Sequence, residues 1–192
     1  MPVKLESNVE KIALERSQRE FIYGPTEKIG IIEVENFPLL GKLTALRFLE
    51  WVQKNPNGVI SLPTGKTPEH FIKYVNKYLS EWNDAKVRKD LEEHGLNTQI
   101  KPDVSGLHFV QIDEFYPLNP NQHNSFYNYV NKYYLDSFGI PKSKAHLINT
   151  EEITLANNMH WTEVFPSGIV DLTLRHREAN SEIEKYQQES VY

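Results

Sequence analysis

Two segments of this 192-residue sequence combine residue types that could bind an anion and move a proton. The first is residues 62–68, which read Leu-Pro-Thr-Gly-Lys-Thr-Pro. These residues lie between a β-branched run and a helical pattern, so their backbone N–H groups should be exposed at a helix N-terminus, where the helix dipole favours negative charge. The spacing is not that of a Walker loop, which favours a small phosphorylated metabolite over a nucleoside triphosphate. An ordinary capped loop between a strand and a helix is the alternative.

The second segment is residues 111–116, in which Asp113 and Glu114 directly follow an apolar run. A carboxylate at the end of a strand can act as the general base of a proton transfer. Adjacent residues of an extended chain point to opposite sides, so only one of the two acids is expected to face a given pocket. The alternative is a solvated strand end that caps the next segment.

The spacing of apolar residues predicts the elements that position these two segments. Short strands are predicted over residues 29–34, 59–62 and 107–112, and helices over residues 37–52, 68–82 and 125–138. Thr67 is expected to be the N-cap of the second helix, with Pro68 in its first position. Strands that alternate with helices favour an α/β fold with a mostly parallel sheet flanked by helices. Ligands of such sheets bind beyond the carboxyl ends of the strands, where both segments lie.

The remaining segments are less regular. Residues 1–30 read as a polar lead-in, and residues 83–106 read as a charged surface excursion that contains a short helix over residues 84–93. Residues 139–150 are expected to form a loop, a short strand and a second loop, and residues 181–192 to begin a further helix.

The composition narrows the possible function classes. With 21 basic and 26 acidic residues the formal net charge is −5, so the chain lacks the electrostatic footprint of a nucleic-acid-binding protein. The absence of cysteine excludes disulfides, thiolate metal sites and cysteine nucleophiles. The seven histidines have no metal-ligand spacing, so no metal site is predicted. No apolar run could span a bilayer and no leader pattern is recognisable, so we expect a cytoplasmic protein without membrane contact.

The two segments together resemble one enzyme family. Residues 62–68 are similar to the Leu-Pro-Thr-Gly-Gly-Thr-Pro loop of glucosamine-6-phosphate deaminases, and residues 112–118 to the Met-Asp-Glu-Tyr-Val-Gly-Leu segment of that family. Residues 124–127 resemble its Glu-Ser-Tyr-Tyr, and the Ile-Pro and Ile-Asn pairs that follow resemble its next stretch. The order agrees, and the resemblance covers residues 37–150.

The resemblance implies a Rossmann-like α/β fold and the conversion of glucosamine 6-phosphate to fructose 6-phosphate and ammonia. It implies that Thr64, Gly65 and Thr67 hold the substrate phosphate, joined here by Lys66, which stands where the family has its second glycine. It also implies that the Asp113–Glu114 pair is catalytic, with Asp113 moving a proton between carbons 1 and 2. No metal or organic cofactor is implied. The expected partner is a small sugar phosphate, and the family also makes a homo-oligomer possible.

The sequence departs from the family in its last part. The family has a later Asp-Gly-His-Ile-Ala-Phe-Asn-Glu segment for ring opening, which has no counterpart here. We therefore expect a single α/β domain over residues 1–192 that is incomplete at the C-terminus, with residues 151–192 as the start of a truncated portion. Three alternatives remain: a non-catalytic sugar-phosphate-binding relative, a 6-phosphogluconolactonase-like hydrolase, whose usual Asp-Glu-Arg differs at Phe115, and a structural domain without sugar-phosphate affinity.

Overall fold

The computed structural model of the chain describes residues 6–17 and 31–191. Its main helices are α1 (Asn8–Ser17), α2 (Phe37–Lys54), α3 (Glu69–Ser80), α4 (Ala85–Glu93), α5 (Phe126–Val130), the π-helical turn η1 (Asn131–Leu135), α6 (Asp136–Phe138), α7 (Trp161–Val164) and α8 (Glu182–Val191). Short 3₁₀ turns are η2 (Lys142–Lys144), η3 (Thr150–Glu152), η4 (Ala156–Asn158) and η5 (Leu172–Arg175). The strands are β1 (Val59–Ile60), β2 (His108–Val110) and β3 (Ala145–His146).

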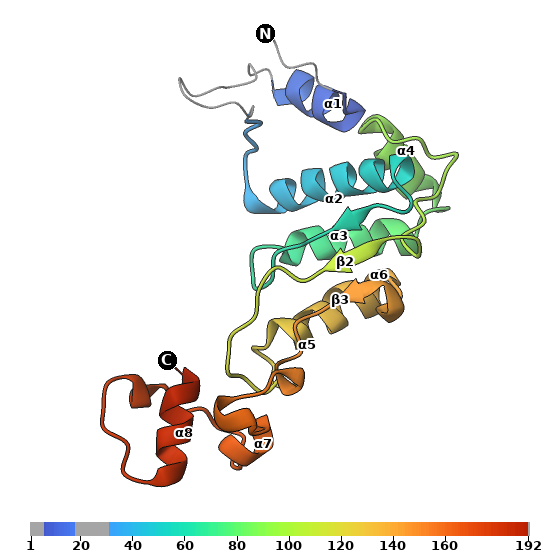
Figure 1. The fold of residues 1–192 in the computed structure, drawn as a ribbon. Coiled ribbons are helices and arrows are strands. Elements are labelled where there is room, and N and C mark those ends of the chain that lie inside the picture. Colours follow the sequence, from blue (N-terminus) through green and yellow to red (C-terminus); the bar gives the residue numbers. More distant parts are fainter. Residues whose placement is uncertain (1–5, 18–30, 192) are drawn as a thin grey trace.

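The three strands form one parallel sheet in the order β1-β2-β3. Ile60 of β1 lies opposite Phe109 of β2, which in turn lies opposite Ala145 of β3. Helices α3 and α4 follow β1 and precede β2 in the chain, and the continuous helical segment α5-η1-α6 connects β2 towards β3 (Figure 1). The predicted α/β fold with a parallel, helix-flanked sheet is therefore confirmed. All three strands run in one direction, so the loops that follow them leave the same edge of the sheet.

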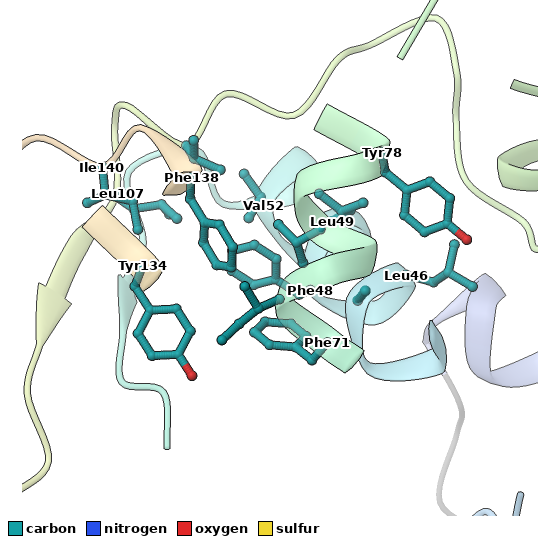
Figure 2. Packing of buried hydrophobic residues seen from close by; sticks show 14 of the residues in the cluster. Leu46, Phe48, Leu49, Val52, Phe71, Tyr78, Leu107, Tyr134, Phe138 and Ile140 are labelled. Carbon is teal, nitrogen blue, oxygen red and sulfur yellow. The ribbon is translucent and has the colours of Figure 1, made fainter. Parts of the chain in front are cut away.

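The main hydrophobic cluster lies between the sheet and the helices. The rings of Phe48, Phe71 and Phe138 meet at its centre with centroid distances of 5.6–6.0 Å, so α2, α3 and α6 share one core (Figure 2). Helices α2 and α3 approach closely at Gly41, where an added Cβ would lie 2.4 Å from the Cβ of His70. The helical spacing predicted over residues 37–52 and 68–82 is thus confirmed by the packing as well as by the backbone.

Some sequence-based expectations are corrected. The N-cap of α3 is Pro68 rather than Thr67, and no side chain caps this helix. Residues 83–106 are more than a surface excursion, because Val87 and Leu91 of α4 are buried in the main cluster. Of the strand predicted over residues 29–34, the first two residues lie outside the described part of the chain, and the others form only an isolated bridge at Ile31.

A second hydrophobic cluster lies in the C-terminal part of the chain. Its buried members are Leu155, Trp161, Val164, Phe165, Leu174 and Val191. Helices α7 and α8, which contribute to it, lie apart from the sheet (Figure 1). A hydrogen bond from Gln122 Nε2 to the Gly168 carbonyl oxygen, 3.2 Å long, is one of the links back to the main body. In neither described range is any helix long and apolar enough to cross a membrane.

Helix α1 is attached to α2 through a buried carboxylate. Glu50 is only 3% exposed, and it accepts hydrogen bonds from the Ser7 hydroxyl at 2.5 Å and from the Asn8 backbone N–H at 2.8 Å. Lys54 lies 3.2 Å from the same carboxylate. Burial by itself would raise the pKa of Glu50, but the hydrogen bonds from Ser7, Asn8 and Lys54 outweigh burial and hold the pKa below its ordinary value of 4.5.

This network makes stability depend on pH in a defined direction. A carboxyl group whose pKa is lower in the folded than in the unfolded state stabilises the fold above the unfolded pKa, and this contribution is lost as the pH falls through the folded pKa. We expect Glu50→Gln to lower the free energy of unfolding by about 1–3 kcal/mol at pH 7. The difference from the unaltered chain should shrink as the pH falls below 4.5. Urea unfolding at several pH values measures this difference in the free energy of unfolding. The control is Glu15→Gln, at an exposed residue of α1.

Candidate functional site

The loop between β1 and α3 presents a row of unused backbone donors. The N–H groups of Thr64, Gly65, Lys66 and Thr67 donate to no acceptor among the described residues. Pro68, the N-cap of α3, offers no side-chain cap to this helix N-terminus. Successive free N–H groups before a helix are an anion-binding arrangement, because the donors and the helix dipole both favour negative charge. The residue types predicted to bind an anion are therefore placed in a geometry that could do so.

Gly65 gives this loop its open shape. Its φ is +92°, a left-handed conformation that strains other residues, and a Cβ at this position would meet no atom within 4 Å. A ligand could therefore approach the backbone closely here. Lys66 and Thr67 are exposed beside it, while Glu69 in the first turn of α3 is paired with Lys73 at 2.6 Å. The pairing offsets the negative charge nearest to the loop.

Asp113 lies on the same edge of the sheet, just beyond β2. The hydroxyl of Ser61 donates to the Val110 carbonyl oxygen at 2.7 Å, so the chain segments that leave β1 and β2 are joined at their start. The Asp113 side chain is exposed, and its carboxylate accepts no hydrogen bond within residues 6–17 and 31–191. A carboxylate that no described residue engages, on the same sheet edge as the N–H groups of residues 64–67, can accept a proton from a ligand bound there.

A buried amide fixes the backbone at Asp113. Gln111 is 5% exposed, and its Nε2 donates to the Asp113 carbonyl oxygen at 2.8 Å. Its Oε1 accepts from the backbone N–H of Ile148, beyond β3, at 3.0 Å. The Gln111 side chain therefore ties the exit of β2 to the exit of β3. This residue is part of the segment selected from the sequence, but its positioning role was not predicted, because nothing in the residue type shows which way an amide side chain points.

Glu114 has a different environment from its neighbour. Its Oε1 accepts from the backbone N–H groups of Phe115 at 2.9 Å and Phe126 at 3.0 Å. Its Oε2 accepts from the Ser125 hydroxyl at 2.8 Å and the Tyr127 N–H at 2.7 Å. Both oxygens are thus occupied at the N-terminus of α5, where a carboxylate is favoured by the free N–H groups and the helix dipole. The Asp113 carboxylate is exposed and accepts from no described residue, whereas the Glu114 carboxylate is hydrogen-bonded through both oxygens. This difference is what the alternation of side chains along an extended chain predicts.

The helical segment that Glu114 caps returns to the loop after β1. The hydroxyl of Tyr129 in α5 donates to the Gly65 carbonyl oxygen at 2.8 Å, and the hydroxyl of Tyr134 in η1 donates to the Pro63 carbonyl oxygen. Glu114, α5 and the loop at Gly65 are therefore one connected structure. The sequence gives an aromatic series here, which indicates packing but not these two bonds. In the part of the chain that the structure covers, no three His, Asp or Glu side chains gather as a metal site.

Comparison with known proteins supports one family. No family model matches the chain. Curated glucosamine-6-phosphate deaminases from three bacteria do: Alkaliphilus oremlandii, 26% identical over 156 residues, Shouchella clausii, 28% over 152, and Bacillus pumilus, 25% over 122. These alignments cover 80%, 76% and 63% of this chain. The chain is similar to glucosamine-6-phosphate deaminases over most of its length. This confirms the resemblance seen in the sequence motifs.

The match covers only part of each deaminase. The alignments include 57%, 53% and 43% of the three relatives, so the chain spans about half the length of the curated deaminases it matches. A solved monomeric glucosamine-6-phosphate deaminase superposes on 61% of this chain with a TM-score of 0.49 and 18% identity.

Proposed function

We propose that the chain binds an amino-sugar phosphate and takes part in the isomerisation and deamination of glucosamine 6-phosphate to fructose 6-phosphate and ammonia. The observation that carries this proposal is the shared sheet edge. The N–H groups of residues 64–67 follow β1 and donate to no described residue, and the Asp113 carboxylate follows the neighbouring strand β2 and accepts from no described residue. Similarity to curated glucosamine-6-phosphate deaminases supports the choice of substrate.

In this proposal the loop after β1 binds the phosphate. The N–H groups of residues 64–67 and the hydroxyls of Thr64 and Thr67 donate to phosphate oxygens, and hydrogen bonds to a charged acceptor are the stronger kind. Lys66 adds a positive charge beside them. Its exposed ammonium group forms no ion pair with any described residue, so it is available to a dianion. The phosphate then fixes the sugar chain relative to the sheet edge.

Asp113 is proposed as the general base. Its carboxylate takes the proton from carbon 2 of the open-chain aldehyde, and the same proton is returned to carbon 1. Carbon 1 becomes the CH₂OH group of the product as its oxygen gains the proton that the nitrogen on carbon 2 loses. Water then hydrolyses the resulting imine at carbon 2 to a ketone and releases ammonia. Glu114, expected to be catalytic from the sequence, is proposed to act through α5 instead, because four donors already occupy its oxygens.

A calorimetric titration of the chain with glucosamine 6-phosphate tests this proposal. We expect saturable binding that Thr67→Val weakens roughly tenfold, because valine keeps the shape of threonine but removes one charge-assisted hydrogen bond. Glucosamine without the phosphate is the ligand control and should bind far more weakly. Binding of both sugars with equal affinity, or an unaltered affinity in Thr67→Val, would contradict a phosphate site in this loop.

A second candidate is a sugar-phosphate-binding protein without catalysis. It is favoured by one observation, which is that Lys66 stands where the deaminases have the second glycine of the loop. The two candidates share the phosphate loop and differ at Asp113. Ammonia release from glucosamine 6-phosphate separates them, since only the enzyme produces it.

A further inference from the structure

Two tyrosines of one helical segment donate hydrogen bonds to backbone carbonyl groups of the loop after β1. Tyr129 bonds the Gly65 carbonyl oxygen at 2.8 Å, and Tyr134 bonds the Pro63 carbonyl oxygen. The two tyrosines are five residues apart, which in a regular α-helix would place them roughly 140° apart around the axis. On such a helix both hydroxyls could not reach the same short stretch of chain.

The π-helical turn η1 removes this difficulty. Its hydrogen bonds span five residues, as in the bond from the Asp136 N–H to the Asn131 carbonyl oxygen. One extra residue per turn brings residues five apart onto neighbouring positions of one face, and π turns are often found at functional sites. The Tyr129 and Tyr134 rings accordingly meet edge to face with their centroids 5.8 Å apart.

The two bonds fix the direction of the peptide groups in the loop. In a trans peptide the C=O of one residue and the N–H of the next point in opposite directions. When Tyr134 holds the Pro63 carbonyl, the Thr64 N–H is turned away from the helical segment. When Tyr129 holds the Gly65 carbonyl, the Lys66 N–H is turned away as well. Both N–H groups belong to the row that has no acceptor among the described residues.

We propose that Tyr129 and Tyr134 are positioning residues of the phosphate loop, whose hydroxyls hold two carbonyl groups back so that the N–H groups of Thr64 and Lys66 stay directed at a ligand phosphate. This inference rests on the proposed function, since it takes the loop to be a phosphate site. Neither tyrosine touches the ligand. They act by setting the loop conformation before the ligand arrives, which lowers the ordering cost of binding.

The surroundings keep both hydroxyls as donors and keep one of them rigid. Burial, helped by Tyr133 and Glu69, raises the pKa of Tyr129 to about 12, and burial also raises the pKa of Tyr134. Tyr134 is fully buried, and its ring stacks on Phe109 of β2 at 5.7 Å. Figure 2 shows it beside Phe138 at the margin of the core. The loop after β1 is thereby fastened to the central strand of the sheet.

Tyrosine-to-phenylalanine variants test this inference, with Tyr133→Phe as the matched control. Tyr133 lies in the same turn, and its hydroxyl bonds no residue in the described ranges. The affinities for glucosamine 6-phosphate and for inorganic phosphate are measured by calorimetry. We expect Tyr129→Phe to weaken both about three- to tenfold, and Tyr133→Phe to leave both within about twofold. Tyr134→Phe should also weaken binding of both ligands. If this change in the core prevents folding, Tyr129→Phe still tests the inference, because Tyr129 is only half-buried.

A second readout separates positioning from general stabilisation. In the unliganded protein, the ¹H–¹⁵N signals of Gly65 and Lys66 should shift in Tyr129→Phe but not in Tyr133→Phe, because only the former releases the Gly65 carbonyl. Unchanged affinity and unchanged signals in Tyr129→Phe would overturn the inference while leaving the phosphate site intact. If the unaltered chain binds neither glucosamine 6-phosphate nor inorganic phosphate, the proposed function fails and this inference fails with it.

Discussion

Asp113→Asn is expected to lower the rate of ammonia release from glucosamine 6-phosphate by about 10²–10⁴-fold, because an amide cannot accept the proton that a general base takes. The side chain is exposed and accepts no hydrogen bond from the described residues, so the substitution removes no structural contact. Asparagine has nearly the same shape, and the phosphate loop on the neighbouring strand is untouched. The dissociation constant for glucosamine 6-phosphate should therefore stay within about twofold. Coupled ammonia detection and calorimetry measure the two quantities.

The control for this substitution is Asp136→Asn. Asp136 is another exposed acid, paired with Lys142 at 3.3 Å and placed at the start of α6 rather than at the carboxyl edge of the sheet. It should leave the rate unchanged. Undiminished ammonia release in Asp113→Asn would show that Asp113 is not the base. Absence of release from the unaltered protein, together with saturable binding, would favour the non-catalytic sugar-phosphate binder.

Glu114→Ala is expected to reduce the free energy of unfolding by about 2–4 kcal/mol. The carboxylate accepts three backbone N–H groups and one hydroxyl, and alanine leaves these donors without their partner at the start of α5. Glu114→Gln should recover only part of the loss, since its amide nitrogen would face donors instead of accepting from them. Urea unfolding followed by circular dichroism measures the change.

The control for Glu114 is the exposed Glu178, whose side chain forms no hydrogen bond or ion pair with the described residues. Glu178→Ala should lie within about 0.5 kcal/mol of the unaltered chain. A loss as small as this in Glu114→Ala would mean that the four hydrogen bonds contribute little, and that Glu114 is not the residue that holds α5 in place.

The sequence predicts much of the scaffold and of the candidate site. The apolar periodicity of α2 and α3 is strong enough to locate both helices, and the position of residues 64–67 and Asp113 after strands places them on one edge of a parallel sheet. The short helix predicted over residues 84–93 is confirmed as α4, but its burial could not be predicted. Val87 and Leu91, four residues apart on one helix face, are surrounded by charged residues that dominate its composition.

Other features could not be predicted because they depend on tertiary contacts. Nothing in the aromatic series 126–138 distinguishes an α-helix from one with a π turn, yet that turn decides whether Tyr129 and Tyr134 both reach the loop. The roles of Asp113 and Glu114 are likewise separated only by the fold. The N–H groups that occupy Glu114 belong largely to α5, which begins more than ten residues later in the sequence.

The most direct test of the central claim is proton NMR of fructose 6-phosphate with ammonium in D₂O, with the unaltered chain and with Asp113→Asn. In the reverse direction, a base on this sheet edge must remove a proton from carbon 1 of the imine that the bound ketose forms with ammonia, and this step does not need the ring opening of the amino sugar. The account predicts that the carbon-1 proton is replaced by deuterium in the presence of the unaltered chain and is retained with Asp113→Asn. Exchange at equal rates with both proteins, or no exchange above the rate without protein, would contradict it.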